Sequence, residues 1–173
     1  MSAHETYDIE IAGLKRSLRL FEIKPGLKIA ILNILGDTEL VQACAKALHE
    51  KLQGLEFDVI VTAEAKSIPL AYALSVETKK PYMGAALIAE TLSITTGEPQ
   101  TLIMDEKDQE DVRGKRAVIV DDVISTGSTL QGMRMIMEKA GAKIIGEAAI
   151  LTEGERAKWE KIISLGHLPL FTD

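Results

Sequence analysis

The residues with the clearest chemical potential are two adjacent acids, Asp121 and Asp122, which directly follow the apolar run 117–120. Two neighbouring carboxylates at the end of a buried strand repel each other and lose hydration, so they need a compensating partner. The cis-diol of a ribose is such a partner, because both of its hydroxyl groups can donate hydrogen bonds. The pair therefore indicates a site for a sugar.

A loop of hydroxyl residues and one glycine comes next, formed by Ser125, Thr126, Gly127, Ser128 and Thr129. The glycine lets the backbone approach a ligand closely, and the N–H groups at the start of a following helix favour a dianionic phosphate. The alternative is a plain strand-to-helix connection with Ser, Thr and Asp as turn and capping residues. The full order of strand, acids, hydroxyl loop and helix favours the phosphate site. A P-loop is excluded because no Gly-Lys-Ser/Thr follows the glycine.

A second loop with chemical potential follows the apolar run 57–62 and contains Glu64, Ala65, Lys66 and Ser67. Taken alone, this loop is more simply a solvated connection. In a parallel sheet, however, ligands bind beyond the carboxyl ends of the strands. Both loops would then lie at the same edge of the sheet.

The elements that must position these loops alternate along the chain, with short apolar strands followed by helices. This alternation predicts an α/β fold, a mainly parallel twisted sheet flanked by helices on both faces. The sequence predicts helices over 7–20, 40–52, 69–79, 128–140 and 155–165. It predicts strands over 27–32, 57–62, 82–88, 116–120, 143–151 and 167–171, with additional strands at 91–94 and 101–104.

Composition narrows the classes of function. The chain has 173 residues, a formal net charge of −6 and a single cysteine, Cys44. The negative charge argues against broad binding to nucleic acid, and no apolar run approaches the roughly 20 residues that span a bilayer. One cysteine excludes an internal disulfide and fits a reducing compartment. We therefore expect a cytoplasmic protein that binds neither nucleic acid nor a membrane.

The segment 118–129 resembles the phosphoribosyl-diphosphate (PRPP) motif of type I phosphoribosyltransferases, and the resemblance covers most of the chain. It is closest to the adenine and xanthine branch. The resemblance implies the type I fold as a single domain over 1–173, with an N-terminal helix and a small base-covering hood at 1–38 and a core at 39–173. By matching positions, Asp121 and Asp122 contact the ribose hydroxyls, and residues 125–129 hold the 5-phosphate.

The loop 64–67 resembles the family's pyrophosphate-binding loop. Glu64, Ala65, Lys66 and Ser67 match it, with Lys66 facing the diphosphate and Ser67 replacing the usual glycine. The resemblance implies that Asp121, Asp122 and Lys66 form the catalytic set.

Three residues are expected at the base. Asn33 lies in a segment similar to the hood of xanthine-type enzymes, Val123 lies within the PRPP motif, and Glu153 stands where xanthine-type enzymes have a lysine. A carboxylate accepts hydrogen bonds and should prefer an amino-bearing or N–H-rich base over a keto one. Two simpler interpretations remain open, with Asn33 as a cap before a helix and Glu153 as a surface acid.

One departure from the family concerns the diphosphate. After Pro81 and Tyr82 the family usually has an Arg-Lys pair, whereas this chain continues with Met83 and Gly84 and has no basic residue there. Losing two cations should weaken PRPP binding and the stabilisation of the leaving group.

The resemblance implies an enzyme of purine salvage, adenine-like, that transfers the phosphoribosyl group of PRPP to a base and releases pyrophosphate. It also implies Mg²⁺ bound mainly through PRPP, no metal site of the protein's own, and a homodimer. The missing Arg-Lys pair keeps two alternatives open. One is a binding or regulatory protein that binds PRPP or nucleotide without efficient transfer, and the other is an enzyme for another phosphoribosyl substrate.

Overall fold

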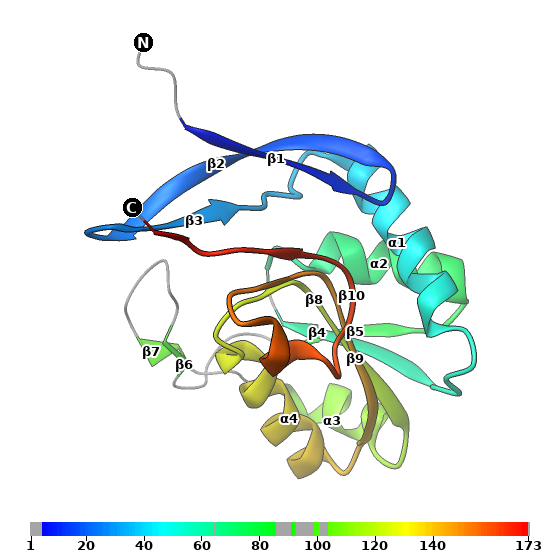
Figure 1. Cartoon of the computed structure of the whole chain (residues 1–173). Helices are drawn as coiled ribbons and strands as arrows, with labels where there is room; N and C mark the ends of the chain where they lie inside the picture. Colours follow the sequence, from blue (N-terminus) through cyan, green and yellow to red (C-terminus); the bar gives the residue numbers. More distant parts are fainter. Residues whose placement is uncertain (1–4, 64, 86–90, 93–98, 101–103, 173) are drawn as a thin grey trace.

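The structure is a computed structural model and describes residues 5–63, 65–85, 91–92, 99–100 and 104–172. Its core is a parallel sheet of five strands in the order β10-β9-β8-β4-β5 (Figure 1). These strands are β4 (Val59–Ala63), β5 (Tyr82–Ala85), β8 (Arg116–Ile124), β9 (Lys143–Glu153) and β10 (Ile163–Leu168). The predicted parallel sheet is confirmed.

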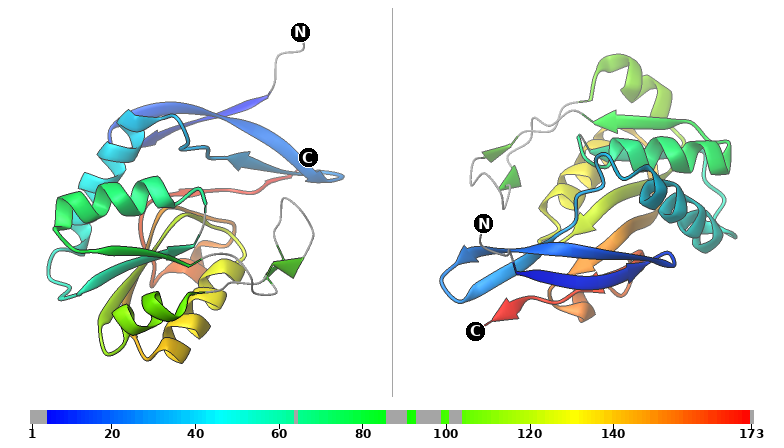
Figure 2. Two further views of the ribbon diagram at one scale, coloured as in Figure 1. Left: turned by 180° about the vertical axis from the view of Figure 1, so that it is seen from behind. Right: turned by 90° about the horizontal axis from the view of Figure 1, so that it is seen from above.

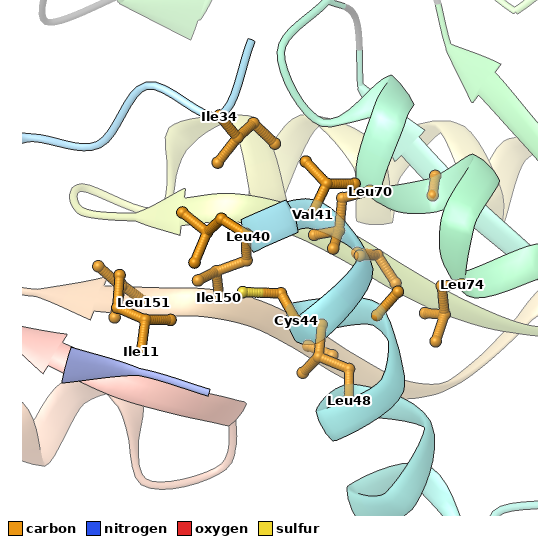
Figure 3. Close-up of a cluster of buried hydrophobic side chains, with 14 of the residues drawn as sticks. Ile11, Ile34, Leu40, Val41, Cys44, Leu48, Leu70, Leu74, Ile150 and Leu151 are labelled. Carbon is orange, nitrogen blue, oxygen red and sulfur yellow. The ribbon is translucent and has the colours of Figure 1, made fainter. Parts of the chain in front are cut away.

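Helices cover both faces of this sheet. The helices are α1 (Thr38–Leu52), α2 (Ile68–Thr78), α3 (Glu106–Val112) and α4 (Ser128–Ala140). Successive residues of a strand point to opposite faces, so Val118 and Val120 of β8 pack with α1 and α2, while Ala117 and Ile119 pack with α3 and α4. Figure 3 shows the first of these layers, where Leu40 and Cys44 of α1 lie beside Ile150 of β9. The prediction of helices on both faces is confirmed.

A second, antiparallel sheet forms a hood over the core. Its order is β1-β2-β3-β11, with β1 (Thr6–Ile11), β2 (Leu14–Lys24), β3 (Leu27–Ile31) and β11 (Phe171–Thr172). Figures 1 and 2 show it as a separate layer, with the terminal strand along its edge. Buried Ile11 and Leu18 join the hood to the cluster that contains Ile150 and Leu151 of the core. Two short strands, β6 (Thr91–Leu92) and β7 (Pro99–Gln100), pair with each other apart from both sheets.

The predicted N-terminal helix over 7–20 is wrong, because this segment is the hairpin of β1 and β2. Ala12 and Gly13 both have positive φ, 50° and 79°, which suits a tight two-residue hairpin turn. The buried positions alternate along the strands, so the period is two rather than 3.6. Phe21, which follows this range and lies in β2, is 58% exposed. The hood is therefore built from strands alone, apart from the approach to α1.

The predicted helix over 155–165 is also wrong. The chain makes one 3-10 turn at Arg156–Trp159 and then enters β10, which pairs in parallel with β9. The predicted strand at 167–171 is divided between the end of β10 and the start of β11. Helix α3 was missed, and residues 86–90, 93–98 and 101–103 of the predicted strands lie outside the described residues.

Within the part of the chain that the structure describes, no helix is long and apolar enough to cross a membrane.

Candidate active site

The acid pair lies at the end of β8 and is tied to the loop after β4 by Ser67. The Ser67 hydroxyl donates to Asp121 Oδ1 at 2.6 Å and accepts the Asp122 backbone N–H at 3.0 Å. Asp121 Oδ1 also accepts the Asp122 N–H at 2.9 Å. Nearby, the Thr62 hydroxyl donates to the carbonyl of Val120 at 2.8 Å and holds the ends of β4 and β8 together. The two loops predicted at the same sheet edge are therefore in direct contact.

The electrostatics of the pair follow from this packing. Loss of hydration around the carboxyl group and the negative charge of Asp122 raise the pKa of Asp121, while the hydrogen bond from Ser67 opposes the rise. Asp122 accepts the Val123 backbone N–H at 2.9 Å, which orients its carboxyl group. The acids are thus oriented by hydrogen bonds from within the protein, and a sugar diol would supply further hydrogen-bond donors.

The hydroxyl loop leads into α4 with an open helix start. Gly127 has a φ of 80° and forms the N-cap, and no side chain caps the helix. The hydroxyl groups of Thr126 and Ser128 lie 2.9 Å apart, and the Ser128 N–H donates to the Thr126 hydroxyl at 3.3 Å. A small hollow is lined by Asp121 and residues 123–130. The backbone N–H groups and hydroxyls here suit a phosphate.

The predicted diphosphate residues divide into two sets. Ser67 is 2% exposed and contacts both acids, so its side chain points into the protein. Ala65 and Lys66 are exposed, and no hydrogen bond or ion pair of Lys66 occurs among the described residues, which leaves its ammonium group available to an anion. Glu64 lies outside the described residues. The role of Ser67 as a link between the loops was missed, because the sequence indicated only a replaced glycine.

The three predicted base residues lie in different settings. Val123 is half-buried beside the acids. Glu153 ends β9, is 4% exposed, and its carboxyl group has no ion pair or hydrogen bond among the described residues. Burial raises the pKa of Glu153 to about 7. The interpretation of Glu153 as a surface acid is therefore wrong.

Asn33 is exposed, and its side chain accepts the Leu35 backbone N–H at 3.3 Å. This bond closes a turn in the segment before α1, and the N-cap of α1 itself is Asp37, so Asn33 does not cap the helix. The structure records no contact between Asn33 and the acid pair, and its role at the base stays a prediction.

One residue of the site was not predicted at all. Trp159 donates its indole N–H to the carbonyl of Glu153 at 2.8 Å, and its ring lies against Gly127. The sequence offered one signal, since Trp159 is the single tryptophan of the chain and follows Glu153 by six residues. The contact could not be inferred from the predicted helix over 155–165, because Trp159 in fact ends a 3-10 turn that follows β9.

The donor chemistry of the site suits a hard cation such as Mg²⁺, which prefers oxygen ligands. Asp121 and Asp122 would supply or orient oxygen atoms towards an ion held mainly by the diphosphate of a ligand. In the described residues, no group of three or more His, Cys, Asp or Glu side chains could hold a metal ion. That Mg²⁺ is bound mainly through PRPP stays a prediction.

Comparison with known proteins places this geometry in a family. The phosphoribosyl transferase domain family matches residues 31–164. The orotate phosphoribosyltransferase of Pyrobaculum aerophilum is 32% identical over 139 residues, which cover 78% of this chain and 67% of the relative. The adenine phosphoribosyltransferase of Clostridium botulinum is 30% identical over 152 residues, which cover 80% of this chain and 85% of the relative.

A solved structure shares the fold. The adenine phosphoribosyltransferase of Thermoanaerobacter pseudethanolicus superposes with a TM-score of 0.68 and 23% identity, covering 87% of this chain and 95% of that chain. The family match spans the acid pair, the hydroxyl loop and the strands that position them. The chain therefore belongs to the type I phosphoribosyltransferase family and is an enzyme that transfers phosphoribosyl groups.

Proposed function

We propose that this enzyme transfers the 5-phosphoribosyl group of PRPP to adenine or a similar amino-bearing purine and releases pyrophosphate. The observation that carries the choice of base is Glu153, a residue only 4% exposed at the end of the strand beside the acid pair. Its carboxyl group has no hydrogen bond among the described residues, where no fully buried side-chain oxygen lacks a partner, so its oxygens keep access to the surface. A ligand could therefore reach this carboxyl group and pair with it.

Glu153 suits an amino-bearing edge in both protonation states. With its pKa near 7, a large share of the carboxyl groups is neutral at neutral pH. A neutral carboxyl group accepts a hydrogen bond from an exocyclic amino group and donates one to the neighbouring ring nitrogen. A keto group beside a ring N–H can also pair with the neutral carboxyl group, which then donates to the keto oxygen and accepts from the N–H, so the choice between the two kinds of base is left to the assay below. Similarity to an adenine phosphoribosyltransferase supports adenine, whereas similarity to an orotate enzyme leaves other bases open.

In the reaction, a ring nitrogen of the base attacks C1 of the ribose while the bond from C1 to the diphosphate oxygen breaks. The electron pair leaves with pyrophosphate, and the attacking nitrogen loses its proton. Asp121 and Asp122 would hold the ribose hydroxyls, the loop 125–129 the 5-phosphate, and Lys66 the diphosphate. Mg²⁺, bound through PRPP, would shield the negative charge of the leaving group. The contribution of the chain is positioning and electrostatic stabilisation.

The test is pyrophosphate release from PRPP and Mg²⁺ with adenine, guanine, hypoxanthine, xanthine and orotate offered singly. We expect adenine to give the highest kcat/KM and Glu153→Gln to lower it. Glu138→Gln, the same change at an exposed position of α4, is the control. A preference for a keto base such as xanthine, or an unchanged preference in Glu153→Gln, would contradict the proposed role of Glu153.

A second candidate function is binding of PRPP or nucleotide without efficient transfer. It is favoured by β5, whose residues Tyr82–Ala85 include no basic side chain where the family usually has two. Binding of PRPP by calorimetry, together with no pyrophosphate release for any base, would support this second function. The cytoplasmic location and the salvage role stay predictions from the sequence.

We also propose that the enzyme is a homodimer. A groove of about 860 Å³ between α1 and α2 is lined by Leu35, Tyr72 and Val76, which are 52%, 57% and 58% exposed. Lys46 and Glu77 line the same groove with opposite charges, so a symmetric second copy could pair them. Sedimentation of the wild type and of Tyr72→Glu tests this proposal, with Phe21→Glu on the exposed hood as the control. A monomeric wild type would contradict it.

A further inference from the structure

Trp159 touches both halves of the candidate site. It ends the 3-10 turn after β9 and is half-buried against the cluster that contains α4. Its indole Nε1 donates to the backbone carbonyl of Glu153 at 2.8 Å. At the other end of the side chain, a Cβ built on Gly127 would lie 2.9 Å from Cη2 of the indole and 3.3 Å from Cζ3. One rigid ring system therefore spans from the base residue to the phosphate loop.

The contact with Gly127 limits where the loop can lie. Real Cβ atoms essentially never come within 3.0 Å of another heavy atom, so only a glycine fits against this ring. Gly127 also provides the positive φ with which the loop enters α4. The position of the indole therefore sets how closely the loop backbone approaches the end of β9.

The contact with Glu153 transmits that position to the base. The indole N–H is bonded to the backbone carbonyl, so movement of the ring changes the end of β9 rather than only a side-chain rotamer. Trp159 is followed by a fixed turn, because the Ile162 N–H donates to its carbonyl at 2.9 Å. The ring is therefore restrained by the turn of its own backbone and by its contacts with Glu153 and Gly127.

We propose that Trp159 is a positioning residue that couples the phosphate loop to the base end of β9, so that a 5-phosphate in the loop raises the affinity for the base. The inference rests on the proposed function and deepens it. By linkage, the base must raise the affinity for the phosphorylated sugar by the same factor. Coupling of this kind predicts a preferred ternary complex, in which each ligand binds better to a site that already holds the other.

The first experiment uses the wild-type protein and its single tryptophan as the reporter. Titration with ribose 5-phosphate should give a saturable change in indole emission, because the ring lies on the loop that binds the phosphate. Ribose without the phosphate should give none at the same concentration. Calorimetry on the same samples measures binding independently of fluorescence. Calorimetric binding of ribose 5-phosphate with unchanged emission would overturn the coupling.

The second experiment measures the coupling factor, defined as the Kd of adenine alone divided by its Kd with saturating ribose 5-phosphate. Trp159→Phe keeps an aromatic ring on the loop side and lacks the N–H that bonds to Glu153. Loss of one hydrogen bond should lower the factor about three- to tenfold. Lys158→Ala, in the same turn, removes an exposed side chain that pairs with Glu155 and should leave the factor unchanged. A purely structural role of the ring would lower thermal stability and leave the factor as in the wild type.

The outcomes separate this inference from the proposed function. The same coupling factor in Trp159→Phe and wild type, with adenine transfer intact, overturns the coupling alone. A coupling factor that falls in Trp159→Phe, in a protein that releases no pyrophosphate, supports the coupling and contradicts the proposed transfer. A wild type that does not bind ribose 5-phosphate overturns both. If Trp159→Phe does not fold, the fluorescence titration of the wild type with ribose 5-phosphate still tests whether the ring responds to the phosphate.

Discussion

Ser67 has a different task from the glycine that the family usually has at its position. A glycine would leave the acid pair without a hydroxyl partner from the diphosphate loop. Ser67 instead donates to Asp121 and accepts from the Asp122 backbone, and so it fixes the carboxyl groups before any ligand binds. Its hydrogen bond also opposes the rise in the pKa of Asp121. We infer that the hydroxyl favours the ionised form of Asp121 and orients the acid pair for the ribose.

Replacing Ser67 by alanine tests this role. The variant removes both hydrogen bonds, so the pKa of Asp121 should rise further and the diol should bind less well. We expect the KM for PRPP to increase about three- to tenfold, with a smaller change in the KM for the base. Ser75→Ala is the matched control, since that hydroxyl bonds only to the Tyr72 carbonyl of its own helix. An equal change in both KM values would indicate general damage to the site.

Glu153 predicts a dependence of stability on pH. Its pKa is raised by burial to about 7, so the folded state binds a proton that the unfolded state has already lost between its ordinary pKa and 7. Stability therefore falls as the pH rises through that window and levels off above it. Glu153→Gln removes the buried charge and should be more stable than wild type at pH 8, by roughly 2–3 kcal/mol, with the difference vanishing near pH 4.

Urea unfolding of both proteins from pH 4 to pH 8.5 measures this difference. Glu138→Gln removes a charge at an exposed position of α4, where the charge is not destabilised by burial, and it serves as the control. A gain in Glu153→Gln that is the same at every pH would show that the charge of Glu153 is not its source.

At the scale of elements, the strands and helices of the core could be predicted from the sequence better than the strands of the hood. The strands of the parallel sheet are continuous apolar runs, and the predicted helix over 40–52 corresponds to α1, which starts two residues earlier behind the N-cap Asp37, whose carboxylate accepts the Leu40 N–H at 3.1 Å. The hairpin of β1 and β2 was missed because leucine and isoleucine can fit both periods over a short stretch. Ala12 and Gly13 form the turn between the two strands, and both have positive φ in the structure. In the sequence, Gly13 was the only mark of this turn.

The candidate site was predictable to the extent that it lies in contiguous segments. Asp121, Asp122 and the hydroxyl loop form one run, and the order of residue types indicates their chemistry. Ser67 and Trp159 reach the site across the fold, and their contacts depend on how the loop after β4 and the turn after β9 are folded. No local pattern encodes such contacts.

The start of α4 can be tested by comparing two glycines with the same backbone requirement. Gly127 and Gly26 have φ values of 80° and 75°, but only Gly127 has neighbours within 4 Å of an added Cβ. Gly127→Ala should displace Trp159 and weaken ribose 5-phosphate binding at least tenfold. Gly26→Ala should only strain its turn, by about 1–2 kcal/mol. Calorimetry and thermal unfolding separate the two effects. Similar ligand affinity in both variants would show that the close contact with the indole is unimportant.

At the scale of the whole molecule, the hood is held by segments from opposite ends of the chain. β11 pairs with β3 through Phe171 and Thr172, and the rings of Phe171 and Tyr7 meet edge to face with centroids 5.0 Å apart. The hood shares one apolar cluster with the core. Ile11 and Leu18 are buried in this cluster, and half-buried Tyr7 and Phe171 pack against its margin. The edge that carries β11 is therefore the less buried part of the hood, and we expect it to open before the parallel sheet does.

Phe171→Ala should loosen this edge selectively. An aromatic pair in this arrangement contributes about 0.5–1.5 kcal/mol beyond its buried area, so local opening of the hood should become more frequent. Hydrogen exchange should then accelerate in β1 and β3 while β8 and β9 keep their protection. Phe21→Ala is the control, because Phe21 lies on β2 and is 58% exposed. If exchange accelerates equally in the hood and in the parallel sheet, the two layers unfold as one unit. The hood could not then open over a bound base while the phosphate loop stays in place.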